Sequence, residues 1–176
     1  MAADGIIEIP GIILLIACIL RCVQYVVQSE SKQSLYFWLA SVLTFFAVIR
    51  RELNYLPELF IASDFSLLNQ SYDWWEDAVL LIVYLLIVGL LAYTCRYLWA
   101  VLKSVPVYLY LMIVGLALLE YMGENAIMIP QGWGEIVEEM AETGVYAIAL
   151  TFIWRFKPLM FERRLPLNKR YSSCQA

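Results

Sequence analysis

Histidine is absent from this sequence, and only 16% of its 176 residues are charged. Without histidine the chain lacks the usual zinc and haem ligand, the base of a Ser-His-Asp triad and the Glu-x-x-His pattern of di-iron bundles. The four cysteines show no framework spacing, so we interpret Cys18, Cys22, Cys95 and Cys174 as small apolar residues. The net charge of −4 gives no basic surplus for nucleic acid.

Apolar residues dominate what is present. They make up 62% of the chain, and the mean hydropathy is +0.71, far outside the balance of a soluble domain. Apolar runs with short connections predict an all-α integral membrane protein, a single membrane-embedded domain over 1–176. We expect a helical bundle of about five transmembrane helices, the first of them retained rather than cleaved as a signal peptide. The predicted spans are roughly 6–27, 35–55, 77–100, 105–129 and 134–156.

Two of these spans contain charged segments. The second has an apolar part of only 15 residues, and its helical pattern continues through Arg50, Arg51 and Glu52 before Pro57 ends it. In the fifth, only 13 residues follow Thr143, fewer than the roughly 20 that cross a bilayer. The glutamates before Thr143 must therefore enter the membrane.

The third span, 77–100, is the most uniformly apolar of the five, and we expect it to be an ordinary lipid-facing or packing helix without chemistry. Before it lies the longest connection, 58–76. In this region the residues 56–65 are expected to form a short interfacial helix. Asn69-Gln70-Ser71 matches a glycosylation sequon, which matters only in a eukaryotic source.

Basic residues indicate the orientation. In the five-span arrangement ten of the 12 lysines and arginines fall on the side of the C-terminus, and only Arg50 and Arg51 fall on the other. The positive-inside rule then places the N-terminus outside and the C-terminus in the cytoplasm. Only Glu30 and Glu162, of 16 acidic residues, lie on the cytoplasmic side. Short loops favour a bacterial inner membrane.

Acidic residues inside the predicted spans are the candidate site. In the fifth helix they recur at i, i+3, i+4 and i+7, which places them on one face, and Tyr146 extends the same stripe. Two further glutamates, four residues apart in the fourth helix, share a face that approaches the same outer end. The predicted cation or proton site consists of Glu120, Glu124, Glu138, Glu139 and Glu142, with Arg51 and Glu52 as charge partners.

Three functions remain open for this cluster. The carboxylates bind a divalent cation such as Mg²⁺, Ca²⁺ or Mn²⁺, or a proton, from the outer phase. Alternatively, they form ion pairs with Arg50 or Arg51 that tie the helices of a structural or accessory subunit together. A metal-dependent membrane hydrolase would use the same carboxylates on a metal-bound water. The sequence decides neither among these nor whether the protein is an enzyme.

The basic C-terminal tail, 157–176, carries Arg163, Arg164, Lys169 and Arg170 directly after the last span. Anionic lipids of the cytoplasmic leaflet attract such a segment by about 1 kcal/mol per basic residue. We therefore expect the bilayer and its anionic lipids as partners of this tail. A protein partner or a homo-oligomer is the alternative.

Overall fold

Helices make up nearly all of the structure that is described. This computed structural model describes residues 4–53, 66–67, 70–125 and 130–164. The helices are α1 (Asp4–Gln28), α2 (Lys32–Glu52), α4 (Tyr72–Tyr93), α5 (Cys95–Ser104), α6 (Val107–Glu124), α7 (Gln131–Arg155) and α8 (Pro158–Arg164). A short antiparallel pair, β1 (Ser66–Leu67) with β2 (Gln70–Ser71), precedes α4.

Three helical segments are long and apolar enough to cross a membrane: Ile9–Gln28, Lys32–Glu52 and Val107–Glu124. The bent pair α4 and α5 gives a fourth if it counts as one span. Apolar side chains on the outside of α4 and α6 are widely exposed, as at Leu85 (63%) and Leu111 (68%), which is the surface that lipid covers. The architecture is that of a helical membrane protein.

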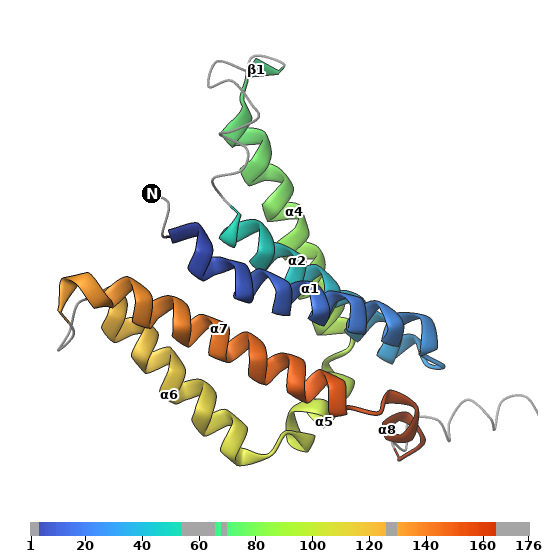
Figure 1. The fold of residues 1–176 in the computed structure, drawn as a ribbon. Coiled ribbons are helices and arrows are strands. Elements are labelled where there is room, and N and C mark those ends of the chain that lie inside the picture. The colour runs from blue at the N-terminus through green and yellow to red at the C-terminus, as the bar shows by residue number, and fades with distance from the viewer. Residues whose placement is uncertain (1–3, 54–65, 68–69, 126–129, 165–176) are drawn as a thin grey trace, which may run out of the picture.

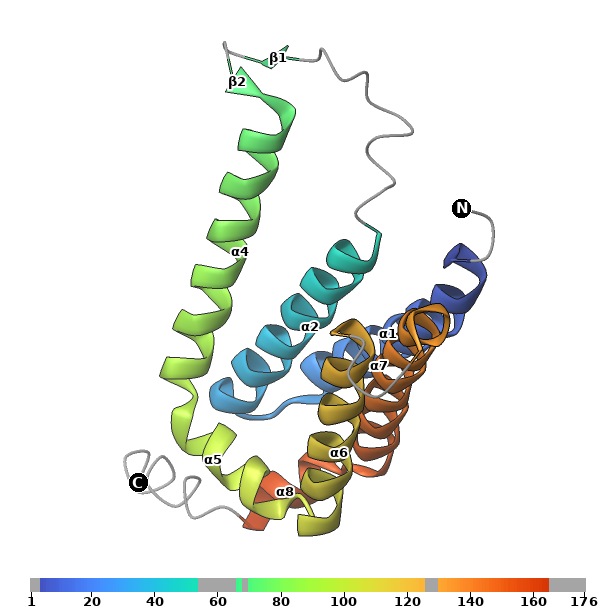
Figure 2. The same ribbon diagram turned by 90° about the vertical axis from the view of Figure 1, so that its left-hand side faces the viewer.

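The long helices follow one another in space in an order that differs from the chain (Figures 1 and 2). Helix α4 packs on α2, α2 on α1, α1 on α7, and α7 on α6. Helix α1 is therefore central, with its hairpin partner α2 on one side and the late helix α7 on the other. This order brings the end of α2 and the acidic part of α7 to the same region of the molecule.

An aromatic core fills the opposite end of the bundle. The Trp38 ring lies 4.7 Å from the Tyr25 ring and 5.3 Å from the Phe156 ring, centroid to centroid. The Tyr25 hydroxyl lies 2.6 Å from the carbonyl oxygens of both Ile153 and Phe156, so it donates to the end of α7, where carbonyls have no helical partner. The cluster of buried residues consists of Cys18, Cys22, Tyr25, Phe37, Trp38, Tyr97, Val101, Ile153 and Phe156.

The expected single helix over 77–100 is corrected by the structure, because α4 and α5 meet at a bend of 80°. Thr94 separates them with φ −97° and ψ 17°, and its buried hydroxyl donates to the Leu90 carbonyl at 2.8 Å. Such a bond bends a helix only slightly, and Thr44 and Thr151 make the same bond inside the unbroken helices α2 and α7. Beyond the bend, the burial of Tyr97 and Val101 in the aromatic core holds α5 across the end of the bundle.

The segment after α7 was predicted to be a basic tail, but its first part forms a helix. Helix α8 folds back on the aromatic core, where the Phe161 ring lies 5.1 Å from Phe156 and 5.6 Å from Tyr97. Glu162 is buried, and its carboxylate accepts a hydrogen bond from the Ser31 backbone N–H at 3.1 Å. This contact puts a carboxylate at the N-terminus of α2, where the helix dipole favours it.

Helices cover the greater part of the other four predicted ranges, 6–27, 35–55, 105–129 and 134–156. That α7 crosses the membrane, that five spans are present and that the N-terminus is outside stay predictions. The predicted interfacial helix, 56–65, lies outside the described residues. Asn69 and the tail from 165 onward are also outside the described residues.

Close approach of α6 and α7 depends on two glycines. A Cβ atom built on Gly123 would lie 2.6 Å from the Gly134 carbonyl oxygen and 3.1 Å from the Glu138 backbone nitrogen. Both obstacles are backbone atoms, so neither can move aside as a flexible side chain would. Small residues at such crossings allow membrane helices to approach closely.

We predict that Gly123→Ala destabilises the protein by about 1–3 kcal/mol, because the added methyl must separate α6 from α7. The measurement is the thermal unfolding midpoint of the detergent-purified protein. Gly115→Ala in the same helix is the matched control, since nothing lies within 4 Å of its Cβ position. That control is expected to gain about 0.5–1 kcal/mol from helix propensity. Equal midpoints for the two variants would contradict the close packing.

Candidate functional site

A polar pocket lies where α1, α2 and α7 meet, at the end of the bundle opposite the aromatic core. Its volume is about 210 Å³, enough for several water molecules or a small ligand. Charged and hydroxyl side chains from α2 and α7 provide most of its wall. The lining residues are Gly11, Arg51, Glu52, Glu138, Glu139, Glu142, Thr143 and Tyr146.

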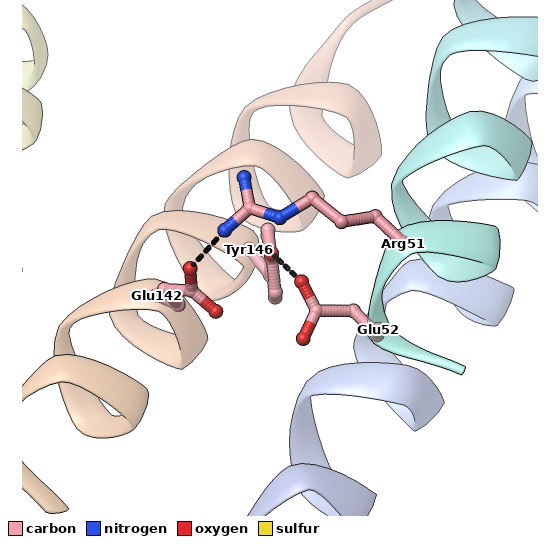
Figure 3. Close-up of polar contacts among 4 residues, drawn as sticks. All are labelled: Arg51, Glu52, Glu142 and Tyr146. Atoms are coloured by element: carbon pink, nitrogen blue, oxygen red, sulfur yellow. Dashed lines mark hydrogen bonds and ion pairs between the residues drawn. The ribbon is translucent and has the colours of Figure 1, made fainter. Parts of the chain in front are cut away.

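Helix α2 delivers its two charged residues from its last turn. The helix ends at Glu52, and the Leu53 backbone N–H returns to the Ile49 carbonyl at 2.9 Å. A cation in the last turn, such as Arg51, also interacts favourably with the negative end of the helix dipole. From this end both Arg51 and Glu52 extend toward α7 (Figure 3).

An ion pair connects α2 with α7 across the pocket. The Arg51 Nη2 donates to Glu142 Oε1 at 2.9 Å (Figure 3). The Arg51 side chain is 70% exposed, whereas the Glu142 side chain is only 14% exposed. The carboxylate is therefore set into the helix packing and the guanidinium covers it from the solvent side.

A second contact runs in parallel with the ion pair. The Tyr146 hydroxyl donates to Glu52 Oε1 at 3.0 Å (Figure 3). Glu142 and Tyr146 are four residues apart, which puts them one above the other on the same face of α7. Neighbouring residues of α2 thus meet neighbouring turns of α7, and the two contacts fix the register between these helices.

Helix α1 closes the pocket at Gly11. A Cβ built on this glycine would lie 3.5 Å from the Thr143 hydroxyl oxygen and 3.5 Å from the Tyr146 ring. These are ordinary van der Waals distances, but any longer side chain would extend against the wall that Thr143 and Tyr146 form. A small residue here therefore preserves the open volume.

Negative charge exceeds positive charge in the pocket. Among the described residues of the lining, four side chains are carboxylates and Arg51 is the one cation. Two further glutamates on α6 add to this field, since Glu120 interacts electrostatically with Arg51, Glu138 and Glu142, and Glu124 with Glu138. Neither α6 glutamate lines the pocket.

The structure thus brings together five of the seven residues that the sequence singled out. Arg51, Glu52, Glu138, Glu139 and Glu142 share the pocket wall. The other two, Glu120 and Glu124 on α6, lie outside the pocket wall and influence the pocket only through their charge. Glu135, the first acid of the predicted stripe, is exposed and outside the lining.

Three lining residues, Gly11, Thr143 and Tyr146, were not among the predicted site residues. Thr143 lies four residues after Glu139, so the helical spacing that selected the acids contained the signal for it. Tyr146 extends the stripe, but its partner on α2 was not predicted. No signal in the sequence marks Gly11, because its place depends on how α1 packs on α7.

The expected divalent cation finds no ligand set in the described part of the chain. There, no three His, Cys, Asp or Glu residues come together in a group that could hold a metal ion. In the pocket, one carboxylate oxygen of Glu142 is engaged by Arg51 and one of Glu52 by Tyr146. What the arrangement offers is acid–base chemistry of carboxylates next to a guanidinium and a phenol.

Comparison with known proteins gives no relative from which a role can be transferred: no family model, curated protein or solved structure matches this chain. Conclusions about the pocket therefore depend on its own geometry.

We predict a small, measurable coupling between Arg51 and Glu142 in a double-mutant cycle with Arg51→Gln and Glu142→Gln. Because the guanidinium is largely exposed, the coupling free energy should be about 0.2–1 kcal/mol. Thermal or denaturant unfolding of the four proteins gives this value. A parallel cycle of Arg51→Gln with Glu135→Gln is the control and should give none, and equal coupling in both cycles would contradict the ion pair.

Proposed function

We propose that this protein is a multi-pass membrane protein whose pocket binds and releases protons from the outer aqueous phase. The observation that carries the proposal is an open pocket between membrane helices with four carboxylates and one cation in its wall. Carboxylates inside membrane proteins are costly and typically mark proton or ion pathways. Each bound proton lowers the excess negative charge of the pocket by one unit.

A proton fits the pocket better than a divalent cation. Mg²⁺, Ca²⁺ and Mn²⁺ need several oxygen ligands arranged around one point. The described residues contain no such group, whereas a proton needs only one carboxylate oxygen. A metal-dependent hydrolase, the enzymatic alternative, would need the same missing ligand group.

In this proposal Glu142 is the proton acceptor and Arg51 controls its charge. Proton transfer from water to a Glu142 carboxylate oxygen neutralises that carboxylate and ends its ion pair with Arg51. The guanidinium then has Glu52 as its neighbour in the same wall, from the next position of α2. Proton binding would thereby loosen one of the two contacts between α2 and α7.

We expect acidification to produce an infrared carbonyl band of a protonated carboxyl group shielded from water. Glu142→Gln should lose this band, because Glu142 is only 14% exposed and glutamine cannot be protonated there. Difference infrared spectroscopy of the protein in vesicles measures it. Glu135→Gln, an equal change at an exposed position of the same helix, is the control and should keep the band. Retention of the band in Glu142→Gln would overturn the assignment.

A structural role is the second candidate, and it is favoured by the two contacts that join α2 to α7. In that case Glu142→Gln lowers the thermal midpoint and no shielded carboxyl band forms in the wild type. Both candidates predict that Mg²⁺, Ca²⁺, Mn²⁺ or a chelator leaves the midpoint unchanged. A saturable rise with one ion, lost in Glu142→Gln, would instead establish a metal site.

The finer topology belongs to the same proposal. We place α7 across the membrane as a fifth span, with the pocket facing outside and α8 in the cytoplasm, and we assign the protein to a bacterial inner membrane. The distribution of basic residues supports this orientation. Anionic lipids would then contact the basic segment that begins after α7.

A further inference from the structure

Helix α4 is long, and it ends before α5 begins at Cys95. Its 22 residues extend about 33 Å, compared with a hydrocarbon core of about 30 Å. At Thr94 the chain turns by 80°, so α5 runs across the end of the bundle rather than along it (Figure 2). Because of this bend, α5 adds little to the length that α4 covers along the bundle.

One face of α5 is fixed to the protein. Tyr97 is 1% exposed and Val101 is 4% exposed, and both belong to the aromatic core. The Ser34 hydroxyl donates to the Tyr97 hydroxyl at 3.2 Å, which ties α5 to the first turn of α2. The helix is thus held in place, and its remaining surface is presented in a fixed direction.

The outward surface of α5 has an apolar and a basic strip side by side. Cys95, Trp99 and Leu102 are exposed at i, i+4 and i+7, which puts them on one face. Arg96 and Lys103, both exposed, lie along its edge, two helical turns apart. The Lys103 Nζ lies 5.3 Å from the centre of the Trp99 ring.

The same end of the molecule carries a second pairing of a cation with tryptophan. The Arg21 guanidinium carbon lies 4.8 Å from the Tyr25 ring and 5.2 Å from the ring of Trp154, which is largely exposed. Glu162, at this end, is buried and engaged with the Ser31 backbone. Glu30 is exposed at this end as well, but among the described residues it is outnumbered by exposed cations, namely Lys32, Arg96, Lys103, Arg155 and Lys157.

We propose that α5 lies along the lipid–water boundary and binds the phosphate groups of anionic phospholipids. Trp99 and Leu102 enter the outer part of the acyl region, while Arg96 and Lys103 extend to the headgroups. Amphipathic helices with tryptophan and leucine on one face and basic residues beside it occupy this depth in bilayers. Lysine and arginine stems can follow the apolar surface while their charges reach the phosphates. The surface is independent of the pocket, which lies at the other end of the bundle.

Depth measurement tests the placement of α5. A nitroxide label is attached in turn to Cys95 and to Leu102→Cys, the latter with Cys95→Ser, and both proteins carry Cys174→Ser. Cys18 and Cys22 are fully buried, so they stay unlabelled. In vesicles both labels should lie at the same shallow depth, accessible to oxygen. A difference of about 10 Å between the depths of the two labels would mean that α5 continues the span. Two labels exposed to water would point to a protein partner. Either result overturns the proposal.

Lipid selectivity tests the phosphate contact. Spin-labelled phosphatidylglycerol and phosphatidylcholine report which lipid associates with the reconstituted protein. Lys103→Gln should lower the preference for phosphatidylglycerol about fivefold, and Arg96→Gln should do the same. Lys32→Gln, which removes an exposed lysine at the same end but on α2, is the matched control and should leave the preference unchanged. No loss in the α5 variants, or an equal loss in the control, would overturn the assignment.

Discussion

Charged side chains that are removed from water must find their partners within the protein, and Glu142 of α7 brings this constraint to the fold because its side chain is only 14% exposed. The helix therefore needs polar or closely packed neighbours along its acidic part. Arg51 supplies an opposite charge to Glu142, and Glu52 accepts from Tyr146. Gly11 allows α1 to approach the same face. Helix α1, in the centre of the helix order, thus packs on the part of α7 that carries these side chains.

The two ends of the bundle are held together by different chemistry. At one end the contacts between α2 and α7 are ionic and hydrogen-bonded around an open pocket, whereas at the other Trp38, Tyr25 and Phe156 pack ring against ring. The aromatic end excludes water, and the Tyr25 hydroxyl covers the carbonyls at the end of α7. Changes of charge at the pocket therefore act on an assembly whose other end stays fixed.

Sequence reasoning was most successful where helical spacing alone decides the outcome. The recurrence of acids in α7 placed Glu138, Glu139 and Glu142 on one face, and the structure puts them in one pocket wall. The bend at Thr94 escaped prediction because no proline or glycine marks it, and burial of α5 in the core was not visible in the spacing. Gly11 was missed for a related reason: a small residue gains its importance only from the helix that packs against it.

Separation along the chain has a consequence for how the protein is made. Arg51 precedes its partner Glu142 by 91 residues, so α1 and α2 are synthesised and inserted long before α7 exists. During that interval the guanidinium must stay in the headgroup region or in water, and the face of α1 that later receives α7 is covered by lipid. Arrival of the last long helix is then the step that both matches the charges and creates the pocket.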